Sequence, residues 1–208
     1  MKISRIVCFW SILIHSGMPL SAQKRWILKK DKDGIKISTR ESNRSRFNDI
    51  KVEMDLTGNI YQLAVILKDV NRYTEWCYGT KKSMLVKITT SDNLIYYSEI
   101  SAPWPASNRD LYANLKVNID SVVHVLKVVS VGEKDYRPVK GGLVRIPYST
   151  GVWNISTVSG NTIHVVYVLQ VDPGGSVPAW ILNLFSTKAP LVTFENLKNK
   201  MLALNYHN

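Results

Sequence analysis

The sequence predicts an α+β protein whose curved antiparallel β-sheet wraps around a long C-terminal helix. Three observations indicate this class: three strand-like segments precede a single short helix, a long run of short β-branched segments follows, and one long amphipathic segment comes last. The short connections within the long run favour antiparallel neighbours. The chain has 208 residues, of which 45% are hydrophobic and 21% charged, which is typical of one globular domain.

A β-hairpin is expected at the start of this domain. Apolar and polar residues alternate over Trp26–Lys30 and over Ile35–Arg40, with Asp33-Gly34 between them. Asp-Gly favours a tight type I′ turn, because both central residues need positive φ. A polar loop over residues 41–46 then leads to a third strand over Phe47–Leu56, whose alternation predicts one buried face.

The middle of the chain changes from strand to helix and back to strand. Apolar residues recur every three or four positions between Asn59 and Val70, which predicts a short amphipathic helix that Thr57 or Asn59 can cap. An aromatic-rich connection over residues 71–80 follows. We expect the later strands over residues 84–89, 94–101, 111–119, 122–131, 141–155 and 162–171, with turns at 118–121 and 159–161.

A long helix is expected over Val177–Leu204. Asp172-Pro173-Gly174-Gly175 ends the last strand, and Pro178 suits the first turn of a helix because its missing N–H has no intrahelical partner there. Pro190 lies inside the segment and should kink or restart the helix. Beyond it, apolar residues recur at three- and four-residue steps and form one stripe.

The first 22 residues have the pattern of a secretory signal peptide. Lys2 and Arg5 form a positive head, residues 6–14 are apolar, and Ala22 ends a segment of small residues before Gln23. We therefore expect a bacterial export signal over residues 1–22, one domain over residues 23–208, and a periplasmic or extracellular location. A core helix or an uncleaved anchor is the alternative, although the apolar run is short for a stable membrane span.

The chain is basic, with a formal net charge of +11, which falls to roughly +9 without residues 1–22. Such a protein can make transient contact with an anionic membrane surface, or the charge can simply keep a solvated surface soluble. Export and the lack of a base-reading motif argue against nucleic acid as a partner. We expect a monomer.

Neither a disulfide nor a metal site is expected in the exported domain. Cys77 is its lone cysteine, so it cannot form an intramolecular disulfide, and a packed thiol is the favoured interpretation. The histidines His124, His164 and His207 lie far apart, and no ligand spacing resembles a zinc or iron site. No cofactor is predicted.

Four local patterns, in their order and at their intervals, resemble the START family, the lipid-transfer domains related to the steroidogenic acute regulatory protein. The patterns are Trp76-Cys77-Tyr78-Gly79-Thr80, Pro103-Trp104-Pro105-Ala106-Ser107-Asn108-Arg109-Asp110, Gly151-Val152-Trp153, and Asp172-Pro173-Gly174-Gly175-Ser176-Val177-Pro178-Ala179-Trp180. The second and fourth are the most specific. The resemblance covers about residues 24–204 and is strongest to exported bacterial members.

The resemblance implies a helix-grip fold with an internal apolar cavity between sheet and C-terminal helix. Members of the family bind a single lipid there, share no catalytic residues, and use the C-terminal helix with a neighbouring loop as a lid. In this chain Gly174 and Gly175 are the candidate hinge and Pro190 the candidate break in the helix. A rigid turn and a static kink are the alternative.

Bulky aromatic residues and one arginine are the candidates for lining this cavity. Buried aromatics of this size also dominate ordinary cores, so core packing is the alternative for each of them. The candidates are Trp76, Tyr97, Trp104, Arg109, Trp153, Trp180, Phe185 and Phe194.

Arg109 is the sharpest polar candidate. Pointing inward, it can hold a ligand headgroup; pointing outward, it can pair with Asp110 or Glu99. The resemblance favours a structural role for Arg109-Asp110, which would lock the entrance of the strand. In sterol-binding members of the family a buried acid–arginine pair touches the ligand hydroxyl. Residues 111–115 supply no second arginine, so the resemblance favours an acyl-chain lipid over a sterol.

Two other functions compete with lipid binding. Cyclases and hydrolases exist on helix-grip folds, but no Ser-His-Asp or paired-carboxylate arrangement emerges from the sequence, so an enzyme is not the favoured interpretation. The other competitor is an interaction protein whose cavity is filled by its own side chains.

Overall fold

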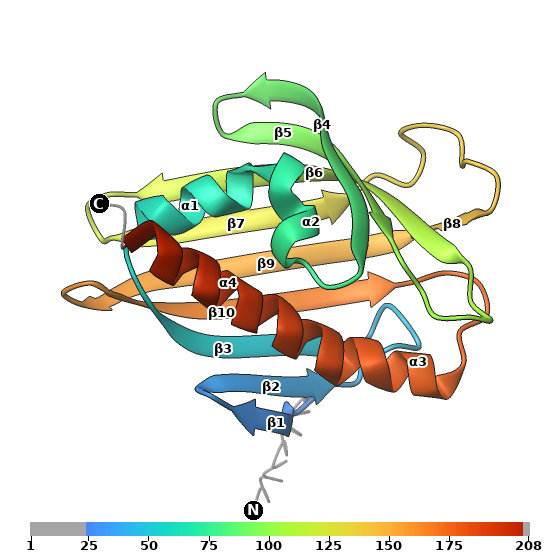
Figure 1. The fold of residues 1–208 in the computed structure, drawn as a ribbon, viewed down its shortest axis with the longest axis horizontal. Helices are drawn as coiled ribbons and strands as arrows, with labels where there is room; N and C mark the ends of the chain where they lie inside the picture. The colour runs from blue at the N-terminus through green and yellow to red at the C-terminus, as the bar shows by residue number, and fades with distance from the viewer. Residues whose placement is uncertain (1–23, 206–208) are drawn as a thin grey trace, which may run out of the picture.

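Ten strands form one sheet in the computed structural model, which describes residues 24–205 (Figure 1). The sheet order is β1-β2-β3-β10-β9-β7-β6-β5-β4, and every neighbouring pair along it is antiparallel. The predicted signal peptide and His207 lie outside the described residues. The strands are β1 (Ile27–Lys32), β2 (Ile35–Arg40), β3 (Asp49–Thr57), β4 (Thr80–Thr90), β5 (Asn93–Ile100), β6 (Asn108–Asp120), β7 (Val125–Gly132), β8 (Leu143–Arg145), β9 (Tyr148–Ser159) and β10 (Thr162–Asp172).

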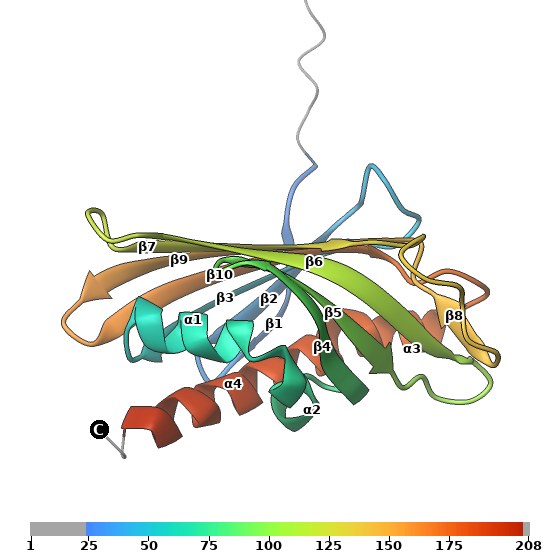
Figure 2. The same ribbon diagram turned by 90° about the horizontal axis from the view of Figure 1, so that it is seen from above.

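The helices all lie on the concave face of this sheet (Figure 2). Three short elements, α1 (Ile60–Lys68), η1 (Val70–Arg72) and α2 (Tyr73–Trp76), cover one part of the face. The C-terminal helix crosses it as three continuous pieces, α3 (Ala179–Asn183), η2 (Leu184–Lys188) and α4 (Ala189–Asn205). The predicted helix-grip arrangement, a curved antiparallel sheet around a long C-terminal helix, is therefore confirmed.

The first elements form where the local sequence predicts them. Asp33 and Gly34 both have positive φ, 53° and 81°, as the type I′ turn requires. Asn59 rather than Thr57 caps α1. Its side chain accepts from the backbone N–H of Gln62, and the Gln62 side chain accepts in return from the N–H of Asn59.

Two predictions about the later strands were wrong. Strand β6 runs on to Asp120, so the turn lies after it rather than at residues 118–121. The strand expected over residues 141–155 is two elements, because Pro147 has no N–H to donate to a ladder. Its first part, β8, pairs with β6 and is parallel to it.

The proline in the C-terminal helix has a local effect. Instead of a restart at Pro190, the five residues Leu184–Lys188, which end two positions before it, form a π-helical turn. Pro190 cannot donate to the carbonyl of Ser186 and its ring crowds that carbonyl, which favours a wider turn just upstream. The hydroxyls of Ser186 and Thr187 donate to the carbonyl of Asn183 in this turn.

The core lies between the concave face and the C-terminal helix from Phe194 onward. Phe194, Leu197 and Met201 follow one another at steps of three and four residues and are fully buried. They meet the inward-facing residues of the sheet, such as Ile163 and Val165 on β10. The alternation of buried and exposed residues along β3 matches this one-sided burial.

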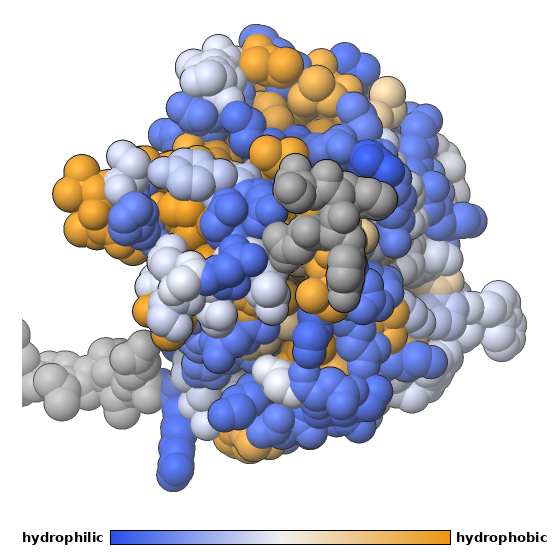
Figure 3. Space-filling view, turned by 60° about the vertical axis from the view of Figure 1, so that its left-hand side comes forward, coloured by the Kyte–Doolittle hydropathy of each residue, from blue (hydrophilic) through white to orange (hydrophobic). Residues whose placement is uncertain are grey.

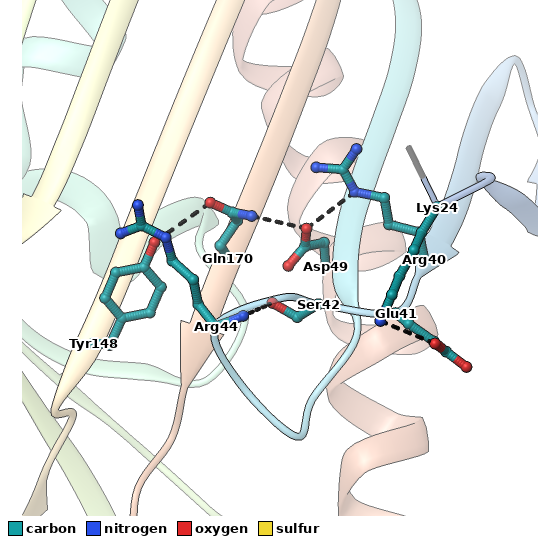
Figure 4. A network of polar contacts seen from close by, with 8 residues as sticks. All are labelled: Lys24, Arg40, Glu41, Ser42, Arg44, Asp49, Tyr148 and Gln170. Atoms are coloured by element: carbon teal, nitrogen blue, oxygen red, sulfur yellow. Dashed lines mark hydrogen bonds and ion pairs between the residues drawn. The ribbon is translucent and has the colours of Figure 1, made fainter. Parts of the chain in front are cut away.

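A polar network on the convex face joins four strands (Figure 4). The side chain of Asp49 on β3 accepts hydrogen bonds from Arg40 on β2 at 3.0 Å and from Gln170 on β10 at 2.8 Å. Tyr148 on β9 donates to Gln170. A cation and an amide therefore compensate the burial of Oδ2 of Asp49, whereas Oδ1 has no hydrogen-bond partner among the described residues.

A buried ion pair lies on the same convex face, near β8. Asp110 on β6 is fully buried, and Arg145 binds both of its carboxylate oxygens at 2.8 and 3.0 Å. Arg145 also donates to the backbone carbonyls of Lys134 and Arg137. The pair therefore fastens the connection over residues 133–142 to the back of the sheet.

Hydrophilic residues dominate the face seen in Figure 3, where hydrophobic residues form small separate groups. Within residues 24–205, every helix is too short or too polar to cross a bilayer.

The buried ion pair gives a direct test of this architecture. Replacing Asp110 by Asn leaves the Arg145 guanidinium buried without its counter-charge, and we expect a loss of about 3–5 kcal/mol in the free energy of unfolding. Denaturant unfolding measures this loss. As the matched control, Asp135→Asn removes an exposed acid 4.0 Å from Lys134 and should change stability by less than about 1 kcal/mol. Equal small losses in both variants would contradict the role of the pair.

Candidate functional site

A cavity of about 530 Å³ lies between the concave face of the sheet and the first half of the C-terminal helix. Strands β5, β6, β9 and β10 form its floor, and α3, η2 and the start of α4 form its roof. The lining ends at Phe194, so the rest of α4 packs directly on the core. Its volume falls within the usual range for small-molecule sites.

Five of the eight predicted lining residues do line the cavity. They are Trp76, Arg109, Trp153, Phe185 and Phe194. Pro190, predicted as a break in the helix, lines it as well. Trp153 and Phe194 stack with ring centroids 5.3 Å apart, which joins the sheet to the helix across one end of the cavity.

The prediction was wrong for the other three residues, which do not line the cavity. Tyr97 lies on β5, but successive strand residues face opposite sides, and its ring packs on Tyr112 against the convex face. Trp104 lies in the loop over residues 101–107, outside any strand, and is 88% exposed. Trp180 is 51% exposed, because its neighbour Ile181 takes the inward direction on α3.

Sequence reasoning missed four tyrosines in the lining, namely Tyr73, Tyr78, Tyr96 and Tyr167. The rings of Tyr167 and Trp153 are in contact, with their centroids 4.4 Å apart, and the two residues are direct cross-strand partners on β10 and β9. The alternation of inward and outward residues along β10 could have predicted that Tyr167 faces the cavity. Tyr96 could not be separated from Tyr97 in this way, because both faces of β5 are buried at this point.

The polar groups in this part of the lining are neutral. Burial raises the pKa of Tyr96 to about 12 and raises the pKa of Tyr73 and Tyr167 well above the ordinary value of a phenol. Burial also raises the pKa of the Cys77 thiol, which supports the packed-thiol interpretation. The Tyr73 hydroxyl donates to the carbonyl of Leu67 at 2.6 Å.

Arg109 enters the cavity from the start of β6. It is only 6% exposed, and its guanidinium donates to the carbonyls of Ser107 and Gly174. The sequence left two orientations open, and the inward one is observed. Asp110 pairs with Arg145 instead, on the other face of the sheet.

The candidate hinge is a tightly packed turn. Gly174 and Gly175 have φ of 67° and 62°, which favour glycine. A Cβ on Gly174 would lie 3.1–3.3 Å from Pro147, Arg145 and Val144, so the position also lacks room.

A metal centre is not formed by the residues described: between 24 and 205, no three His, Cys, Asp or Glu side chains are grouped to hold an ion. The lining residues themselves include two arginines, Arg46 and Arg109, and no Asp, Glu or His.

Comparison with known proteins identifies the family. The START domain family matches residues 14–207, so the chain belongs to this family. Its fold is similar to the crystal structure of a STAR-related lipid transfer protein from Xanthomonas axonopodis. That structure is 30% identical, has a TM-score of 0.76, and aligns over 85% of this chain and 98% of its own.

Two curated relatives extend the comparison. The phosphatidylcholine transfer protein of Mus musculus is 25% identical over 188 residues, which cover 88% of this chain and 85% of that protein. The uncharacterized protein PA1579 of Pseudomonas aeruginosa is 28% identical over 177 residues, covering 84% and 85%. Two of these three relatives are therefore lipid transfer proteins by name.

Proposed function

We propose that this protein binds a single lipid molecule in the 530 Å³ cavity and transfers it between membranes. The observation that carries the proposal is a partly open cavity lined mainly by apolar and aromatic side chains in a member of the START family. Burial of acyl chains in such a space is favourable by about 0.8 kcal/mol for each CH₂ group. The lipid-transfer names of two relatives agree with the proposal.

An acyl-chain lipid suits this lining better than a sterol. The resemblance associates sterol binding with an acid–arginine pair inside the cavity. The buried pair of this chain, Asp110 and Arg145, faces the convex side, and the lining residues contain no acid. A sterol hydroxyl would therefore lack the charged pair that is expected to hold it.

Binding without catalysis is also part of the proposal. General acid–base chemistry needs a group whose pKa lies near the working pH. The lining contains no Asp, Glu or His, and its buried phenols and thiol have raised pKa values that keep them protonated near neutral pH. The helix-grip cyclase or hydrolase alternative therefore finds little support among the described residues.

Two exposed tryptophans favour contact with a membrane during transfer. Trp104, in the loop between β5 and β6, and Trp180, at the start of α3, are both largely in water. The loop and α3 lie side by side in the two views of the fold (Figures 1 and 2). Tryptophan suits the interface between water and lipid, and the basic chain would be attracted to anionic headgroups.

Lipid binding is tested by filling the cavity. Leu169 on β10 is a half-buried wall residue, and we expect Leu169→Trp to occupy space that the acyl chain needs. Titration with a fluorescent fatty acid should give one site per wild-type protein and at least about tenfold weaker binding in this variant.

Leu169→Met is the matched control, because it nearly conserves volume and should bind like the wild type. Equal binding by the tryptophan variant, with an unchanged thermal unfolding midpoint, would place the ligand elsewhere. Absence of binding by all three proteins would refute lipid binding itself.

Membrane contact is tested by lipid transfer between vesicles. We expect Trp104→Ala combined with Trp180→Ala to slow transfer between anionic vesicles several-fold, because two interfacial anchors are lost. Val122→Ala is the control: Val122 is 87% exposed but lies beyond the opposite end of β6. Transfer at an unchanged rate in the double variant would refute this docking surface.

Export to the periplasm or the medium completes the proposal, and it rests on the sequence pattern of residues 1–22. The intact mass of the protein recovered from its bacterial host should correspond to a chain that begins at Gln23. Ala22→Arg, which removes the small residue at the cleavage point, should retain the longer chain. A full-length wild-type chain in the cytoplasmic fraction would contradict export.

A further inference from the structure

The cavity contains a buried positive charge without a carboxylate partner. Arg109 is 6% exposed, and among the described residues no acidic oxygen lies within 4.0 Å of its guanidinium nitrogens. Residues 1–23 and 206–208 contain neither Asp nor Glu. An unpaired buried charge is costly, so this arrangement calls for a counter-charge from outside the chain.

The alternation of the strands explains why nearby acids do not serve. Arg109 on β6 pairs in register with Ile100 on β5, and both side chains line the cavity. The next pair, Asp110 and Glu99, must face the convex side. There Asp110 is already bound by Arg145 through both oxygens.

The guanidinium keeps donors available for a ligand. Its Nη1 donates to the carbonyl of Ser107 and its Nη2 donates at 3.4 Å to the carbonyl of Gly174. Arginine has five N–H donors, so these two contacts leave most of them for another acceptor. Burial lowers the pKa of Arg109 from its ordinary value, but an arginine stays charged in a protein.

The position of Arg109 suits a headgroup rather than a chain end. It lies next to the Gly174–Gly175 turn, where the exposed Arg46 donates to the carbonyl of Gly175 at 2.8 Å. Along the same strand the lining continues to Leu115. The six steps from Arg109 to Leu115 span about 20 Å of antiparallel strand, so the lining extends roughly this far from the charged end.

We propose that the ligand is a lipid with an oxyanion, a carboxylate or a phosphate, which Arg109 binds while the acyl chain extends along β6 toward Leu115. The planar guanidinium matches the two oxygens of such a group and forms charge-assisted hydrogen bonds with them. This inference rests on the proposed lipid-binding function and adds the chemical class of the ligand and the residue that selects it.

Matched lipids test the inference on the full-length protein. Palmitic acid is compared with methyl palmitate, and dioleoyl phosphatidic acid with dioleoylglycerol, by displacement of a neutral fluorescent acyl probe at pH 8. We expect the anionic member of at least one pair to bind at least about tenfold more tightly than its neutral partner. Equal affinities within both pairs would overturn the inference but leave lipid binding intact, whereas failure of all four lipids to bind would refute the proposed function as well.

Variants assign the preference to Arg109. Arg109→Met should bind the neutral lipids as the wild type does and lose the preference for the anionic ones, and Arg109→Lys should retain part of it. Arg44→Met is the matched control and should keep the preference, because Arg44 is exposed and does not line the cavity. A preference that persists in Arg109→Met, or that disappears in Arg44→Met as well, would overturn the assignment.

Two further measurements cover a variant that fails to fold and a site that binds free phosphate. If Arg109→Met fails to fold, as judged by circular dichroism, the comparison of Arg109→Lys with the wild type decides the assignment, and an unchanged preference there overturns it. Inorganic phosphate alone should not bind measurably at millimolar concentration. Binding of phosphate as tight as that of phosphatidic acid would show a free-anion site and overturn the lipid part of the inference.

Discussion

The contact of one helix with a curved sheet along only half of its length determines the rest of this structure. From Phe194 onward the C-terminal helix packs directly on the concave face, and Leu197 and Met201 are completely buried. Before Phe194 the same helix roofs a cavity. The packed half supplies core burial for stability, and the other half leaves the space in which a ligand can lie.

Buried charged residues on the two faces of the sheet have different kinds of partner. On the convex face, the buried acids have partners inside the chain: Arg145 binds both oxygens of Asp110, and Arg40 and Gln170 bind one oxygen of Asp49. On the concave face, Arg109 has only carbonyl partners. The alternation of side chains along the strands produces this division, because adjacent residues Arg109 and Asp110 must face opposite ways.

The sequence predicted the structure best where hydrophobic periodicity and local turn or capping residues determine an element. The hairpin at Asp33-Gly34, the capped helix after Asn59 and the C-terminal helix follow from patterns of a few residues. The site was harder. Burial on both sides of β5 removes the alternation that would distinguish Tyr96 from Tyr97, and the pairing of Asp110 with Arg145 joins residues 35 positions apart. Trp104 and Trp180 are bulky enough for a core, but their exposure depends on a loop and a helix face that composition does not define.

The central claim is that the cavity holds one lipid. The most direct measurement is mass spectrometry of the organic extract from full-length protein purified without detergent from its bacterial host, with protein and lipid quantified together. The account predicts close to one molecule of acyl-chain lipid per protein molecule, which native mass spectrometry should also show as a single added mass. The account would be contradicted by a protein that is free of lipid in both measurements and that also fails to bind added fatty acid probes.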